Sequence, residues 1–300
     1  VLTLDHFSKI YPNGRGARNI TFSVERGQVV GLLGANGAGK STLLRLISGV
    51  LKADNGIILI DGEPVYENEA AKRQIFFLPD DPYYTSNING SGLAELYKTF
   101  YDFDAEVYGR YLDQFKLSPK APIRNFSKGM KRQVFVSLAL AVRPKYLLLD
   151  EAFDGLDPLA RMVFKRGVID LVEEKGSTVI ISSHSLRELE DICDHVGLLH
   201  HGGVLLSREL EDMKCNIQKV QCVFSSEEEA DKLLSVLDIV KKEKRGSLHT
   251  LTVRGGRDEI LAQFAAAETY FYEVLPLSLE EIFISETEVT GYDIKKLLLG

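Results

Sequence analysis

Apolar positions along the chain follow two different periods. Short, nearly continuous apolar runs of the kind that form buried strands occupy residues 28–33, 57–60, 75–78, 146–149 and 178–182. Apolar residues spaced three and four apart, as on one face of a helix, occupy residues 42–47, 94–100, 105–115, 130–142 and 159–174. Because strands that alternate with helices build a parallel sheet covered by helices, this order predicts an α/β core with a parallel sheet.

Two segments of the first 207 residues depart from that alternation. Residues 2–7 and 20–24 alternate apolar and polar side chains on either side of a Pro/Gly-rich connection, which predicts an N-terminal antiparallel β-subdomain. From residue 81 to 142 the predicted elements are all helices, at 94–100, 105–115 and 130–142, which predicts a helical subdomain inserted into the core.

The pattern changes again after Ser207. The order strand, helix, strand, helix, strand predicts a small α+β domain over residues 208–300, separate from the domain over 1–207. Closing helices are expected at 278–283 and 292–299. This second domain carries no recognisable catalytic constellation.

Composition narrows the class of protein. The chain has 300 residues, a net charge of −7 and a pI near 5.5, so it lacks the basic balance of a nucleic-acid-binding protein and no nucleic-acid partner is expected. No window resembles a membrane span or a secretion signal, and we expect a cytoplasmic protein. The three cysteines form no C-x-x-C pair, which favours reduced thiols without zinc.

Residues 34–42 carry the strongest chemical signal. They fit the pattern G-x-x-x-x-G-K-[ST] and lie between a predicted strand and a predicted helix. Glycines let successive backbone N–H groups face phosphate oxygens, and the helix start adds partial positive charge. Lys40 is then expected at the terminal phosphates and the Ser41 hydroxyl at magnesium. The segment predicts a nucleotide site within a P-loop NTPase core, without separating kinases, GTPases and transport ATPases.

Two carboxylates end the apolar strand at 146–149. Asp150 and Glu151 are adjacent, so the pleat directs them to opposite sides of one strand tip. One of them can hold magnesium while the other polarises a water molecule. The alternative is a pair of solvated carboxylates at the start of a loop; the phosphate-binding loop favours the catalytic interpretation.

Three weaker features gain meaning only together with these motifs. Ser127 and Gly129 precede a helical run, which is typical of an N-cap and also suits an anion. Asp157 lies in the loop after the carboxylate pair, and His184 follows the last buried strand. A single histidine at a strand end is usually structural.

In this order, the motifs resemble those of the nucleotide-binding subunit of ATP-binding cassette (ABC) transporters. The resemblance covers residues 1–207 and rests on the phosphate-binding loop, Ser-x-Gly-x-x-x-Gln at 127–133, Leu-Leu-Leu-Asp-Glu, Gly-Leu-Asp-Pro and His184. It implies catalytic roles for Lys40, Glu151 as general base, and His184. It implies magnesium ligands at Ser41 and Asp150. It implies that ATP is bound by Tyr11, Gly34, Asn36, Gly37, Ala38, Gly39, Lys40, Ser41, Thr42, Ser127, Gly129 and Asp157.

The resemblance also implies partners. Two cassettes would face each other head to tail with two ATP molecules between them, Ser127 and Gly129 of one serving the ATP of the other. A membrane permease subunit on a separate chain, as in exporter-type systems, would hold the cassette at the inner face of the membrane. Tyr83 and Tyr84 are candidates for that contact, because exposed aromatic residues are typical interface anchors.

Two positions depart from the family pattern. The signature reads Phe-Ser-Lys-Gly-Met at 126–130 in place of Leu-Ser-Gly-Gly-Gln, keeping the serine and the second glycine. Asp80 stands where the family has a glutamine, and its carboxylate could still ligate magnesium.

Three other functions remain open on the sequence. A soluble cassette acting on nucleic acid or ribosomes is disfavoured by the single cassette and the acidic balance. A cassette that senses ATP with little hydrolysis is motivated by Asp80. A small-molecule kinase would require the signature motif to be accidental.

Overall fold

The computed structural model describes residues 1–288. The chain divides into two compact units with the boundary between Ser207 and Arg208. The helix predicted at 292–299 lies outside the described residues. Among the helices that are described, none combines the length and apolar character needed to cross a bilayer.

The first unit begins with an antiparallel sheet of strand order β2-β1-β4-β5. Its strands are β1 (Leu2–Ile10), β2 (Gly16–Val24), β4 (Asn55–Ile60) and β5 (Glu63–Pro64). Leu4 of β1 pairs with Phe22 on one side and Ile58 on the other. This is the antiparallel β-subdomain that the alternating pattern predicts.

A second sheet forms the centre of this unit, with strand order β10-β9-β3-β8-β7-β6. Its strands are β3 (Val29–Leu33), β6 (Ile75–Leu78), β7 (Tyr146–Leu149), β8 (Thr178–Ser183), β9 (His195–His200) and β10 (Gly203–Glu209). The β9-β3, β3-β8, β8-β7 and β7-β6 pairs are parallel. Every residue of β3, β7 and β8 is buried, which explains why these strands carry no charged residue and why β8 is polar only at Thr178, Ser182 and Ser183.

Strands β9 and β10 were not predicted from the sequence. The apolar run of β9 is short and has a histidine at each end, and β10 mixes polar and apolar residues. Their pairing next to β3 is a long-range contact with no local signal.

Helix α1 (Lys40–Ile47) is buried on most sides. Leu43, Leu44, Leu46 and Ile47 belong to one core cluster that also contains residues of both sheets. The remaining helices of the core are α2 (Glu69–Lys72), α6 (Pro158–Lys175) and α7 (Leu186–Leu189). The core thus fixes the start of α1 beside the strand ends.

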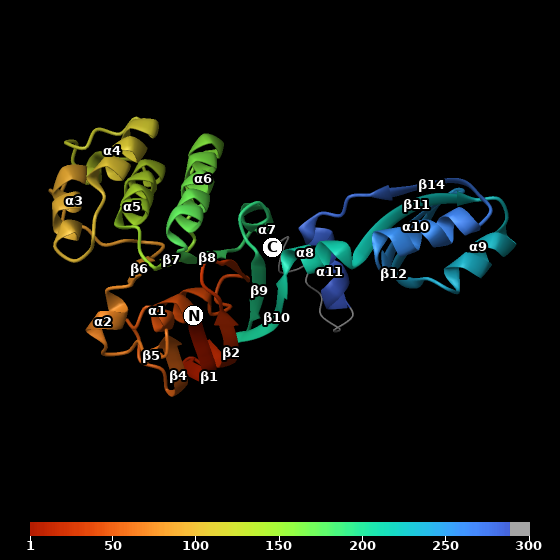
Figure 1. The fold of residues 1–300 in the computed structure, drawn as a ribbon, viewed down its shortest axis with the longest axis horizontal. Coiled ribbons are helices and arrows are strands. Elements are labelled where there is room, and N and C mark those ends of the chain that lie inside the picture. The colour runs from red at the N-terminus through yellow and green to blue at the C-terminus, as the bar shows by residue number, and fades with distance from the viewer. Residues whose placement is uncertain (289–300) are drawn as a thin grey trace. The chain divides into compact units, whose positions relative to one another are not determined.

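The helical subdomain lies between β6 and β7, as predicted. It contains α3 (Gly90–Lys98), α4 (Ala105–Gln114), the short 3-10 helix η1 (Ile123–Asn125) and α5 (Lys128–Val142). Helices α3, α4 and α5 are grouped together in Figure 1. Residues 132–142 of α5 are all buried, so this helix is the centre of the subdomain.

The second unit contains a four-stranded antiparallel sheet of order β12-β13-β11-β14. Its elements are α8 (Leu210–Cys215), β11 (Ile217–Phe224), α9 (Glu227–Leu234), β12 (Asp238–Arg245), β13 (Leu248–Arg254), α10 (Arg257–Ala266), β14 (Thr269–Leu275) and α11 (Leu279–Glu288). From β11 to β14 the order is βαββαβ, an α+β arrangement. Strand β12 was not predicted, because it is a highly charged edge strand with little apolar pattern.

Candidate nucleotide site

The phosphate-binding loop opens on a cavity of about 340 Å³. Several predicted residues line it: Tyr11, Asn36, Gly37, Gly39, Lys40, Ser41, Thr42, Asp80 and Glu151. Ala35 of the predicted loop also lines it, together with Asn13, Arg15 and Gly16, which were not predicted. The connection between β1 and β2 and the loop between β3 and α1 therefore face the same space.

Glycine is required in this loop for steric reasons. Gly39 has φ +109°, and a Cβ there would lie 2.8 Å from the carbonyl oxygen of Gly16. A Cβ on Gly34 would lie 2.6 Å from the carbonyl oxygen of Leu199. Gly39 is also the N-cap of α1 and provides no side-chain acceptor, so the first N–H groups of the helix remain available to an anion.

Lys40 is almost completely buried beneath the loop. Its Nζ donates to the carbonyl oxygen of Gly34 at 2.5 Å and lies 3.1 Å from Oε1 of Glu151. A buried ammonium group requires such partners. The two residues predicted to act on the terminal phosphate and on the attacking water are thus in direct contact.

Ser182 organises the carboxylate pair at the tip of β7. Its Oγ donates to Oδ1 of Asp150 at 2.7 Å and accepts the Glu151 N–H at 3.0 Å. Ser41 Oγ donates to the same Asp150 oxygen at 3.1 Å. Burial raises the pKa of Asp150; hydrogen bonds from Ser182 and Ser41 oppose this, and the charges of Glu151 and Asp80 reinforce it.

The oxygens of Ser41 and Asp150 suit magnesium. The structure brings together the two residues predicted as its ligands, and a hydroxyl and a carboxylate are hard donors of the kind that magnesium prefers. The geometry is therefore compatible with a magnesium ion at this point of the cavity.

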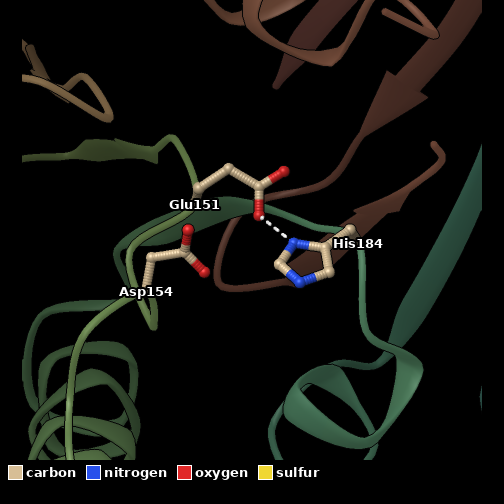
Figure 2. A group of neighbouring side chains, drawn as sticks. All are labelled: Glu151, Asp154 and His184. Atoms are coloured by element: carbon tan, nitrogen blue, oxygen red, sulfur yellow. Dashed lines mark hydrogen bonds and ion pairs between the residues drawn. The ribbon is translucent and has the colours of Figure 1, made fainter. Parts of the chain in front are cut away.

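Glu151 also contacts His184, which follows β8. His184 Nδ1 lies 3.0 Å from Glu151 Oε2, and Figure 2 shows both side chains directed toward each other, with Asp154 beside them. Glu151 has φ +47°, in the left-handed region that a residue with a Cβ rarely adopts. Such backbone strain is concentrated at functional sites, where the surrounding structure holds it.

Asp80, which was predicted as a metal ligand, is paired with an arginine side chain. It follows β6 and lines the cavity, but its Oδ1 accepts a hydrogen bond from Nη2 of Arg132 at 2.7 Å. Arg132 lies on α5 and is 3% exposed.

Comparison with known proteins identifies the family. The family model for ABC transporters matches residues 17–154. The bacitracin transport ATP-binding protein BcrA of Bacillus licheniformis is 31% identical to the chain, over 71% of each protein. The chain belongs to the ATP-binding subunits of ABC transporters. As an ABC cassette it binds ATP and is an ATPase.

Other relatives extend this likeness. The ABC transporter ATP-binding protein YtrB of Bacillus subtilis is 27% identical over 95% of this chain and 98% of its own length, so it also spans the second unit. A solved ATP-binding subunit of an ABC transporter is 30% identical, with a TM-score of 0.65 over 71% of this chain and 92% of that one.

In this ABC cassette the signature residues Ser127 and Gly129 are not among the residues that line the cavity. Ser127 Oγ accepts the Met130 N–H and caps α5, which confirms the predicted N-cap. A Cβ on Gly129 would lie 2.4 Å from the carbonyl oxygen of Gly155, so the signature packs tightly on the loop that leads to Asp157. Asp157 caps α6 by accepting the Ala160 N–H at 2.8 Å.

Two of the side chains that organise the cassette were missed at the sequence level. Ser182 was not predicted, although a hydroxyl at the carboxyl end of a buried parallel strand is a recognisable signal. Arg132 was also missed; its signal is a positive charge on a helix face that is otherwise buried.

Proposed function

We propose that the chain works as a pair of cassettes placed head to tail, with magnesium-ATP bound between the phosphate-binding loop of one copy and the signature of the other. One observation carries this proposal: Ser127 and Gly129 are not among the residues that line the cavity with Lys40 and Glu151, and their contacts are with the first turn of α5 and with Gly155. The capped start of α5 presents free N–H groups, a suitable contact for the terminal phosphate of a partner's ATP.

Within each site the residues have distinct tasks. Lys40 neutralises phosphate charge, and Glu151 accepts a proton from the attacking water, in the manner of a general base. His184 orients the Glu151 carboxylate through Nδ1. Ser41 and Asp150 hold magnesium, which when bound neutralises charge on the phosphates.

A groove on the cassette suits a membrane partner. It has a volume of about 380 Å³, with an aromatic side formed by Tyr97, Phe100 and Tyr101 and a charged side formed by Glu69, Lys72 and Arg73. An amphipathic helix from a separate permease chain would fit this combination. Such a partner would hold the cassette at the inner face of the membrane, as part of an exporter-type transporter.

The two tyrosines proposed as anchors differ in exposure. Tyr83 is 87% exposed and free to meet a partner. Tyr84 packs on Phe135 of α5, with the Lys131 ammonium 5.6 Å from its ring centroid. Tyr83 is therefore the better candidate for the contact.

The solution mass of a Glu151→Gln variant tests the paired arrangement. Without hydrolysis, magnesium-ATP should convert the variant from monomer to dimer, and adding Ser127→Arg should abolish the dimer while ATP still binds. A Glu151→Gln protein that binds magnesium-ATP and remains monomeric would contradict the proposal.

A further inference from the structure

Arg132 donates three hydrogen bonds to the segment that follows β6. Nη1 donates to the carbonyl oxygen of Pro79 at 3.2 Å, and Nη2 donates to both the carbonyl oxygen and Oδ1 of Asp80 at 2.7 Å. The planar guanidinium can make these bonds together, which a lysine ammonium on a flexible stem does not reproduce.

Burial differs between the two partners. The Arg132 side chain is 3% exposed and the Asp80 side chain 51%. A buried guanidinium needs a counter-charge, since removing one partner of a buried ion pair leaves an uncompensated charge. Asp80 supplies that charge from the edge of the nucleotide cavity.

The pair joins two parts of the ATPase. Asp80 lies in the cavity lining with Lys40 and Glu151, whereas Arg132 lies five residues after Ser127 on the same helix. At about 1.5 Å of rise per residue, the clamp is roughly 7 to 8 Å along α5 from the signature serine. A shift of Asp80 would therefore move the beginning of α5.

We propose that Asp80 and Arg132 form an ionic clamp that sets the position of the signature relative to the nucleotide cavity, and that Arg132 is a positioning residue for ATP hydrolysis. On this account the carboxylate of Asp80 serves Arg132 and is not a magnesium ligand. The inference rests on the proposed two-copy site, because the signature acts there on the partner's ATP.

A double-mutant cycle tests the clamp in the full chain. The variants are Asp80→Asn, Arg132→Gln and the two combined, with kcat and the magnesium concentration for half-maximal rate as the measurements. Each single change should lower kcat about ten-fold, and the double change should lower it no further, because both remove the same contact. The magnesium requirement should stay unchanged, and Arg132→Lys should recover part of the rate.

Arg166→Gln is the matched control. Arg166 lies on α6 in an exposed ion pair with Asp170, so its replacement should leave kcat unchanged. Binding of a fluorescent ATP analogue shows that each variant is folded, and ATP-driven dimer formation in the Glu151→Gln background reports signature placement directly.

The competing role for Asp80 predicts different data. If Asp80 ligates magnesium, Asp80→Asn should raise the magnesium requirement at least about ten-fold, Arg132→Gln should not, and the two losses in kcat should multiply. That result would overturn the clamp. All rates are compared with hydrolysis by the unaltered chain, so this failure would leave the ATPase activity and the two-copy site standing.

Discussion

At the scale of single residues, the site depends on a few buried polar groups that hold one another. Ser182 lies on β8 and contacts both Asp150 and the backbone of Glu151, which follow β7. Its hydroxyl is buried, so both of its hydrogen bonds are made away from water. One serine thus fixes the orientation of the two carboxylates that we propose as the magnesium ligand and the general base.

Replacing Ser182 with alanine should impair catalysis more than folding. The change leaves a buried Asp150 oxygen with one donor fewer, which should cost about 1 to 3 kcal/mol of unfolding free energy. Loss of a group that orients site residues should lower kcat about ten-fold to a hundred-fold. Urea unfolding and steady-state phosphate release measure the two effects.

Ser177→Ala is the control for this experiment. Ser177 is equally buried and donates to the carbonyl oxygen of Pro144 at 2.7 Å, but it has no contact with the carboxylate pair. It should lose comparable stability and keep its kcat. Equal losses of kcat in both variants would show that Ser182 has no special role.

At the scale of elements, helix starts are well specified by local sequence. Asn89, Asp104, Ser127 and Asp157 each accept a backbone N–H in the first turn of α3, α4, α5 and α6. The apolar periods predicted these four helices, but only the cap at Ser127 was recognised in the sequence, and α3 begins at Gly90, four residues before the predicted start at 94. Strand β12 was not predictable, because an edge strand is formed by pairing and its charges protect it from aggregation.

Asp104→Ala should lower the free energy of unfolding by about 1 kcal/mol at neutral pH, because it removes the N-cap of α4. The pKa of Asp104 is lowered chiefly by the hydrogen bond from the Val107 N–H, and the Arg143 guanidinium lowers it further. A lowered pKa in the folded state gives stability that is complete above the unfolded value of about 4 and is lost as the pH falls further.

Urea unfolding at pH 7 and pH 3.5 checks this cap. The difference between wild type and variant should shrink at the lower pH, because below its unfolded pKa the Asp104 carboxyl binds a proton more readily in the unfolded chain than in the folded one. Asp113→Ala, at an exposed position of the last turn of α4, should change stability by no more than about 0.5 kcal/mol. A pH-independent difference for Asp104→Ala would contradict the capping account.

At the scale of the whole molecule, sequence motifs locate the chemistry but not the contacts between distant segments. The phosphate-binding loop and the carboxylate pair were found from local patterns, since their function constrains consecutive residues. The Asp80–Arg132 pair spans 52 positions and has no such pattern. The two residues meet because α5 packs against the end of β6.

The two units have separate cores. Leu251 is fully buried in the core of the second unit, whereas every proposed ATP-binding residue lies in the first. Leu251→Ala should therefore lower stability by about 2 to 5 kcal/mol without weakening ATP binding. Leu148 is equally buried in β7, two residues before Asp150, so Leu148→Ala should lower both the stability and the affinity for ATP. Urea unfolding and ATP titration of each variant provide the comparison, and weaker ATP binding by Leu251→Ala would contradict it.

Complementation between two inactive variants tests the paired site most directly. Lys40→Ala disables the phosphate-binding loop and Ser127→Arg disables the signature, so each variant alone should hydrolyse almost no ATP. Mixed together, they should reach up to about a quarter of the wild-type rate, because half of randomly formed pairs are mixed and each mixed pair has one intact site. A mixture no more active than the average of the two variants alone would contradict the head-to-tail arrangement.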